Sequence, residues 1–144
     1  MLKKIINFSK KRDFKFFVYE KFSKFIGHIG ISINKLIYQS RLEIIEPYKV
    51  WGLVRIIING TGKISIGKNF YAVSDKKRSM ITLFTPCSLN IIDDGKIIIG
   101  DHVGINGTTI VSRDKIILGD NCMIGPNTII IDHDGHDLWP VEKR

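Results

Sequence analysis

The sequence IILGDNCMIGPNTIIIDHDGH, residues 116–136, contains a glycine directly after an aliphatic residue at two positions six residues apart. These pairs are Leu118-Gly119 and Ile124-Gly125, and the same pairing occurs earlier at Ile66-Gly67 and Ile99-Gly100. Around these pairs the aliphatic residues follow a period of six. The members of this series are Ile99, Ile105, Val111 and, after a slip of one residue, Leu118, Ile124 and Ile130.

A period of six fits neither of the two common amphipathic patterns. An α-helix repeats its apolar residues every three or four positions, and a hairpin strand alternates every two. A unit of six with glycine or asparagine after the aliphatic residue is typical of a parallel β-helix, in which three units form one coil of about 18 residues. The aliphatic side chain points into the three-sided coil, and the small residue lets the backbone turn the corner. We therefore predict a mainly β fold, a parallel β-helix, over residues 51–144.

The period is interrupted between Tyr71 and Asn90. The polar run Ser74–Ser79 contains no aliphatic residue, and we predict that it projects from a coil as a loop. A further turn is predicted at Asp93-Asp94-Gly95, because aspartate and glycine favour tight turns.

The N-terminal part of the chain carries most of the excess positive charge. Residues 1–45 contain ten Lys or Arg and three acidic residues, whereas the remainder contains twelve and eleven. The composition changes at Glu46-Pro47-Tyr48, where the proline disfavours helix in the residue before it. We therefore predict two parts, a basic amphipathic helical segment over residues 1–50 and the β-helix over residues 51–144.

Within the basic segment, apolar residues recur at helical intervals of three and four. We expect one helix, a break at Gly27–Gly30, and a second helix over Ile31–Ile45. Three interpretations of the segment compete: its aromatic face packs as a cap over the end of the β-helix, it lies on an anionic membrane surface, or it binds nucleic acid. We expect no nucleic-acid partner, because no recognised binding motif accompanies the charge. The apolar face consists of Phe14, Phe17, Val18, Phe22, Phe25 and Ile26.

The cysteines and the apolar runs bear on the location of the protein. Cys87 and Cys122 form neither a CxxC motif nor a disulfide framework, and no cleavable signal peptide is evident. No uncharged apolar run reaches the length of about 18 residues that a spanning helix needs. We therefore expect a reduced, cytoplasmic chain, with membrane association through residues 1–45 as the alternative.

Three stretches resemble a known family. Ile64–Gly67, Lys96–Thr109 and above all Ile116–His136 are similar to the hexapeptide-repeat acyltransferases. The nearest resemblance is to the O-acetyltransferases typified by maltose and galactoside acetyltransferases and by those of surface-polysaccharide biosynthesis. It covers roughly residues 55–144, and the run from Gly-Pro-Asn into Asp-x-Asp-x-His is its most specific part.

The resemblance implies both a fold and an activity. The fold is a left-handed β-helix that assembles as a homotrimer, with acetyl-CoA in the cleft between adjacent copies. The activity is transfer of the acetyl group from acetyl-CoA to a hydroxyl of a sugar or a surface-polysaccharide precursor.

The resemblance also implies which residues act. His136 matches the family's general base, and Asn106 matches an asparagine that holds the acceptor or the tetrahedral intermediate. An imidazole suits this role, since its pKa lies close enough to 7 for it to take a proton from a hydroxyl during attack. A nearby carboxylate would orient the ring, and Asp132 and Asp134 are both candidates.

Other interpretations of these residues stay open. His133 is a second histidine in the same loop. The run Asp132–Asp137 has enough acids and imidazoles for a metal site, but zinc ligands usually come from separate segments, so we expect no metal. The alternative function is a non-catalytic β-helix that serves as a scaffold or an oligomerisation module.

The sequence ends at Arg144, shortly after His136, whereas the resembled enzymes continue for several coils. We therefore expect a β-helix that is incomplete at its C-terminal end, and weak acetyl-CoA binding by residues 1–144 alone. An inactive acetyltransferase fragment is a further alternative.

Overall fold

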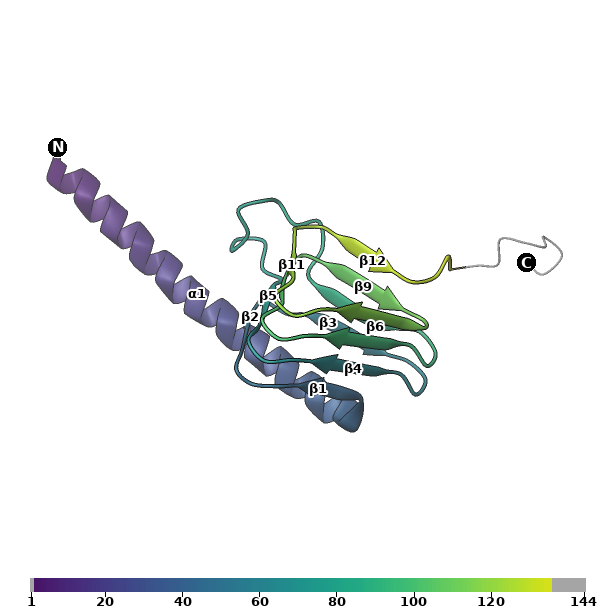
Figure 1. Cartoon of the computed structure of the whole chain (residues 1–144). Helices are drawn as coiled ribbons and strands as arrows, with labels where there is room; N and C mark the ends of the chain where they lie inside the picture. The colour runs from purple at the N-terminus through teal and green to yellow at the C-terminus, as the bar shows by residue number, and fades with distance from the viewer. Residues whose placement is uncertain (1, 136–144) are drawn as a thin grey trace.

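The computed structural model describes residues 2–135, with side chains from residue 14 onward (Figure 1). A single helix, α1, spans Leu2–Tyr38 and is followed by a 3-10 turn at Gln39–Arg41. Short strands joined by turns follow over residues 42–131. They are β1 (Leu42–Ile44), β2 (Tyr48–Trp51), β3 (Arg55–Ile58), β4 (Lys63–Ile66), β5 (Phe70–Val73), β6 (Ser88–Ile91), β7 (Lys96–Ile99), β8 (Gly104–Asn106), β9 (Thr109–Ser112), β10 (Lys115–Leu118), β11 (Met123–Ile124) and β12 (Ile129–Ile131).

Consecutive strands lie in three different sheets, which the chain visits in strict rotation. Sheet A has the order β1-β4-β7-β10, sheet B β2-β5-β8-β11 and sheet C β3-β6-β9-β12. Every neighbouring pair is parallel. Each strand from β4 onward therefore lies beside the strand three places earlier in the chain (Figure 1). This topology confirms the predicted mainly parallel β fold and is compatible with a β-helix.

Alternation along the strands sends aliphatic side chains into the space between the three sheets. In β7, Ile97 and Ile99 are buried while Ile98 faces outward. Ile97 pairs with Ile64 on one side and with Ile116 on the other. The inward side chains therefore stack from one coil to the next, and each coil is stabilised mainly by its neighbours.

The period of six placed Val111 among the side chains that point into the coil, and this prediction is wrong. Val111 is only half-buried, and its neighbours Ile110 and Ser112 are buried instead. Gly107 turns the corner before β9 with a φ of 52°, and Ile110, five residues after Ile105, takes the register position that Ile130 has in the next coil. Leu118 then follows Ile110 by eight residues, so the period of six fails on both sides of β9.

The expected break in the N-terminal helix is also wrong. Helix α1 runs without interruption through Gly27 and Gly30. A Cβ at Gly27 would overlap the carbonyl oxygen of Val50 in β2, and one at Gly30 would lie 2.7 Å from Leu53 Cδ2. The two glycines are therefore points of close approach between α1 and the chain that follows it.

The end of the helix also differs from expectation. Helix α1 ends at Tyr38, not near Ile45, and β1 begins at Leu42, before the predicted boundary at residue 51. Leu42 and Ile44 are both buried on either side of the exposed Glu43, which is strand periodicity. Strand β1 belongs to sheet A because it pairs with β4.

The face of α1 that packs on the strands is not the aromatic one. The helix packs against β1 and β2, as a cap would. However, its buried residues are Ser23, Gly27, Gly30 and Ile31, whereas the predicted aromatic face is largely exposed. The interpretation that this face packs over the β domain is therefore wrong, because small residues allow the closer approach. In the described part of the chain, no helix is both long and apolar enough to cross a membrane.

Candidate active site

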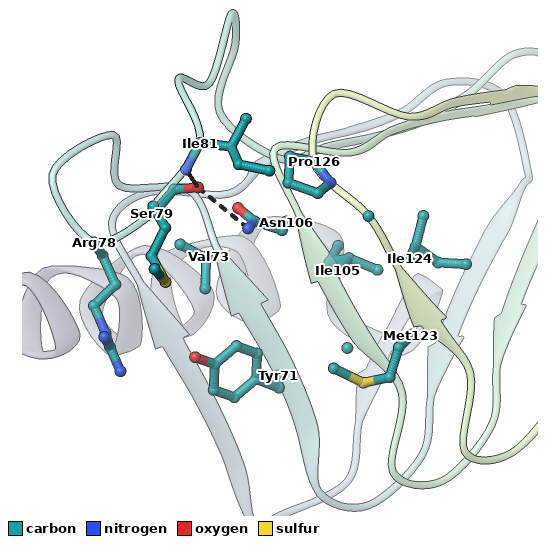
Figure 2. A pocket seen from close by; sticks show the side chains of 13 residues that line it. Tyr71, Val73, Arg78, Ser79, Ile81, Ile105, Asn106, Met123, Ile124 and Pro126 are labelled. Atoms are coloured by element: carbon teal, nitrogen blue, oxygen red, sulfur yellow. Dashed lines mark hydrogen bonds between the residues drawn. The ribbon is translucent and has the colours of Figure 1, made fainter.

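The loop of residues 74–87 joins β5 to β6 and is the projecting loop that the interrupted period predicts. We call it the insertion loop. It borders a groove of about 420 Å³ on the outer side of sheet B (Figure 2). The strands contribute Tyr71, Gly104, Asn106 and Met123 to the lining, and the insertion loop contributes Arg78 and Ser79.

Asn106 ends β8 with its amide in this groove (Figure 2). Its Nδ2 donates to Ser79 Oγ at 3.3 Å, and its Oδ1 is buried with no partner among the described residues. Its backbone carbonyl accepts a hydrogen bond from the N–H of Asn127 at 3.2 Å, which links it to the next coil. A buried amide oxygen without a partner is a group that a donor on a ligand would satisfy.

The local sequence explains the direction of the Asn106 side chain. Ile105 points into the coil and is 1% exposed, so alternation turns Asn106 outward. The next residue, Gly107, has a positive φ, and a Cβ there would lie 2.8 Å from Leu83 Cδ2 of the insertion loop. Glycine at this corner therefore lets the loop pack directly against the end of β8.

The insertion loop is tied to α1 through Asp75. The Tyr19 hydroxyl lies 2.7 and 2.6 Å from the two carboxylate oxygens, the Ser23 hydroxyl donates to one of them, and the Lys77 N–H donates at 2.9 Å. Burial raises the pKa of Asp75, but the hydrogen bonds from Ser23, Tyr19 and Lys77 outweigh burial and hold that pKa below its usual value. Burial, together with the neighbouring carboxylate, raises the pKa of Tyr19 to about 12. We call this set of contacts the Asp75 clamp.

Asn127 ties the insertion loop to the opposite side of the groove. Its Oδ1 accepts a hydrogen bond from the Phe84 N–H at 2.8 Å, and its Nδ2 donates to the Thr82 carbonyl at 2.9 Å. Asn127 has a φ of 60°, which asparagine tolerates better than most residues. The Gly-Pro-Asn sequence therefore positions a wall of the groove in this chain.

Asp132 is engaged in the turn that follows β9. It accepts hydrogen bonds from the Ser112 hydroxyl at 2.7 Å, the Arg113 N–H at 2.7 Å and the Asp114 N–H at 3.1 Å. Burial raises the pKa of Asp132, but these hydrogen bonds prevail and lower it. Its carboxylate is therefore ionised at neutral pH, and its oxygens accept hydrogen bonds from the preceding coil.

Other aspartates make the same kind of contact between coils. Asp101 accepts from the Lys68 N–H and Asp120 from the Asp101 N–H, each at 2.7 Å. Asp94 likewise accepts from the Thr61 hydroxyl at 2.6 Å. Asp132 therefore belongs to a series of aspartates that join neighbouring coils at the corners.

The other predicted residues lie near or beyond the last described strand. Asp134 is exposed. His133 is half-buried, and neither of its ring nitrogens has a partner in the described chain. His136 lies outside the described residues, so its role as a general base stays a prediction.

Asn106 and Asp132 lie at opposite ends of β9 in a single chain. Asn106 precedes this strand, whereas Asp132 contacts Ser112 at its far end. Four residues of extended strand span about 13 Å. One copy of the described chain therefore does not bring these two predicted site residues together.

The sequence did not identify the walls of the groove. Ser79, Arg78 and Tyr71 lie inside or beside the interval in which the period of six fails. That failure was the available signal, because an insertion in a regular coil is where a surface cavity can form. Among residues 14–135, no group of three His, Cys, Asp or Glu side chains is placed to hold a metal ion.

Comparison of the chain with family models, curated proteins and solved structures finds no match. The resemblance to hexapeptide-repeat acyltransferases therefore rests on the sequence segments quoted above.

Proposed function

We propose that the protein is an O-acyltransferase that moves an acetyl group from acetyl-CoA to a hydroxyl of a sugar or a surface-polysaccharide precursor. The observation that carries the proposal is the position of Asn106. The family asparagine holds the acceptor or the tetrahedral intermediate, and here the matching amide lines a groove with its oxygen unpaired among the described residues. Such a groove, mostly apolar with a few placed polar groups, suits a small ligand.

For the coil we propose the left-handed sense that the resemblance implies. Asn69, His102 and Asn121 precede successive strands of sheet B and have φ between 57° and 61°. The repeated positive φ at one corner supports a regular coil with equivalent turns. An experimental structure with a right-handed coil would contradict this part of the proposal.

The proposed reaction assigns a role to three side chains. His136 takes the proton of the acceptor hydroxyl while the hydroxyl oxygen attacks the thioester carbon. The unpaired Oδ1 of Asn106 accepts a hydrogen bond from the acceptor, and the Nδ2 hydrogen that Ser79 does not use donates to the oxyanion that forms. The intermediate then expels the CoA thiolate, which takes the proton from the imidazolium. Asp134 is the proposed orienting carboxylate, because Asp132 is engaged by the turn after β9.

We further propose that each site forms between two copies in a homotrimer. The separation of Asn106 and Asp132 along β9 supports this, since residues near Asp132 must meet the asparagine of a neighbour to act with it. Closed cyclic assembly gives every copy the same contact, so a trimer would contain three equivalent sites.

The first test measures release of the CoA thiol from acetyl-CoA in the presence of hydroxyl acceptors. The assay uses the polypeptide purified as its gene encodes it. His136→Ala should lower kcat/KM by about 100- to 10,000-fold, and Asn106→Ala by about 100- to 1,000-fold. His102→Asn is the matched control, because it changes an exposed corner histidine to a residue that tolerates the same φ.

The second test examines where the two residues meet. Inactive His136→Ala and Asn106→Ala chains are co-expressed in equal amounts and purified as mixed trimers. If each site takes one residue from each of two copies, about a quarter of native activity should return. Activity no higher than that of the separate variants would contradict a shared site.

The scaffold alternative has its own outcome. Calorimetry that detects no acetyl-CoA binding, together with no thiol release for any acceptor, would contradict acyl transfer. An intact oligomer under those conditions would favour a structural or oligomerisation role.

A further inference from the structure

Helix α1 carries a continuous apolar stripe that no other described part of the chain covers. The side chains recur at intervals of four and three residues, and each is between 40% and 77% exposed. An exposed apolar patch of this length is typical of an interaction surface. We call it the outer stripe; its members are Phe14, Val18, Phe22, Phe25, Ile29, Ile33 and Leu36.

The packing of α1 explains why the outer stripe points away from the strands. Ser23 and Gly27 are buried against β2, so residues on the other side of the helix face outward. The N-terminal half of α1 also extends clear of the three sheets (Figure 1). The outer stripe is therefore available along most of its length to something outside this chain.

The charge beside the outer stripe is positive. Glu20 is the only acidic residue between positions 14 and 38. It pairs with Arg78 at 3.4 Å and is therefore directed toward the insertion loop, away from the stripe. An apolar face bordered by lysines is typical of a helix that binds a membrane surface. The lysines in this part of α1 are Lys15, Lys21, Lys24 and Lys35.

The spacing of the outer stripe differs from that of an ordinary left-handed coiled coil. Intervals of four, four and three residues give a repeat of 11 residues over three turns, about 3.67 residues per turn. This is close to the helix's own value of about 3.6, so the stripe runs nearly straight along α1. Helices that wind around each other in an ordinary coiled coil instead show a repeat of about 3.5.

We propose that α1 lies along an anionic lipid surface, with the outer stripe in the boundary between headgroups and acyl chains. Lys15, Lys21 and Lys24 contact the lipid phosphates, whereas Lys35 is directed toward β1, where its Nζ donates to the Ile44 carbonyl at 3.2 Å. Charge complementarity selects this partner over a second α1, because residues 1–45 carry ten basic and three acidic residues and two such segments would repel each other. The proposal does not depend on acyl transfer.

The test is flotation of the full chain with vesicles of phosphatidylcholine, alone or mixed with phosphatidylglycerol. The chain should float with the mixed vesicles and much less with phosphatidylcholine alone, and added salt should weaken its binding. Phe22→Ser with Phe25→Ser should lower the partition coefficient on the order of tenfold for each side chain. Lys15→Glu with Lys21→Glu should remove the preference for phosphatidylglycerol.

The control variant is Phe84→Ser with Ile117→Ser, which removes side chains that are 77% and 57% exposed elsewhere. This variant should float like the wild-type chain. Equal flotation of the Phe22 and Phe25 variant, or no dependence on phosphatidylglycerol, would overturn the proposal. So would a fall in molar mass by light scattering for that variant without lipid, because the stripe would then be a contact between copies.

Discussion

The two ends of the stack of coils differ in what covers them. In the first coil, Leu42 and Val50 are 2% and 0% exposed, because α1 packs against β1 and β2. In the last described coil, the inward residues Leu118, Ile124 and Ile130 are only half-buried. The inward aliphatic side chains are therefore fully buried only in coils that have a neighbouring coil or helix on each side.

The largest expected effect compares two leucines of sheet A. Leu42→Ala should lower the free energy of unfolding by about 4 kcal/mol, because the buried side chain leaves a cavity between α1 and the first coil. Leu118→Ala, in the half-buried row of the last described coil, should cost about 2 kcal/mol. Urea unfolding followed by circular dichroism measures both. Equal losses would show that both ends are equally covered in solution, for example by assembly of several copies.

The next prediction separates α1 from the first coil. Gly27→Leu improves helix propensity by roughly 1 kcal/mol, but its side chain must displace the Val50 carbonyl. We expect the steric overlap to outweigh the gain in helix propensity, so the free energy of unfolding should fall by about 3 kcal/mol. Ser32→Leu adds the same side chain at an exposed position of α1 and should leave stability nearly unchanged. A stable Gly27→Leu chain with unchanged protease resistance of α1 would contradict the close approach.

These two ends also show how far the fold could be predicted from sequence. The parallel strands with inward aliphatic residues follow from a regular pattern, because each side chain repeats the environment of the one a coil earlier. The continuity of α1 could not be predicted in the same way. Gly27 and Gly30 signal either a break or a close contact, and only the position of Val50 distinguishes the two.

Only the part of the candidate site that lies in the regular coils could be predicted from the sequence pattern. Asn106 lies in a regular strand, so its outward direction follows from the burial of Ile105. Asp132 was a candidate from its motif, yet its hydrogen bonds to the turn after β9 depend on the coil before it. The groove itself depends on the insertion loop, whose position is set by Asp75 and Asn127 and follows no period.

The smallest expected effect concerns the Asp75 clamp, which joins α1 to the insertion loop beside the groove. Asp75→Ala removes the carboxylate of the Asp75 clamp and should lower the free energy of unfolding by about 2 kcal/mol at neutral pH. Asp93→Asn is the control, since it removes the charge of an exposed ion pair with Arg113 at 3.6 Å and keeps a residue type that tolerates the φ of 55° at this position. Protease cleavage within the insertion loop should also become faster in the Asp75 variant and not in the control.

The pH dependence of this difference tests its electrostatic cause. The pKa of Asp75 is lowered in the folded chain, so its contribution is present above the ordinary carboxyl value of about 4 and disappears as pH falls through the folded pKa. The pKa of Tyr19 is raised from 10.0 to about 12, so the contribution of the phenol is present below pH 10 and is lost as pH rises through that range. The stability difference between wild-type and Asp75→Ala chains should therefore be greatest between these limits and shrink on both sides. A difference that stays constant from acid to alkaline pH would mean that Asp75 acts by packing alone, and the groove wall would then not depend on the charge that joins it to α1.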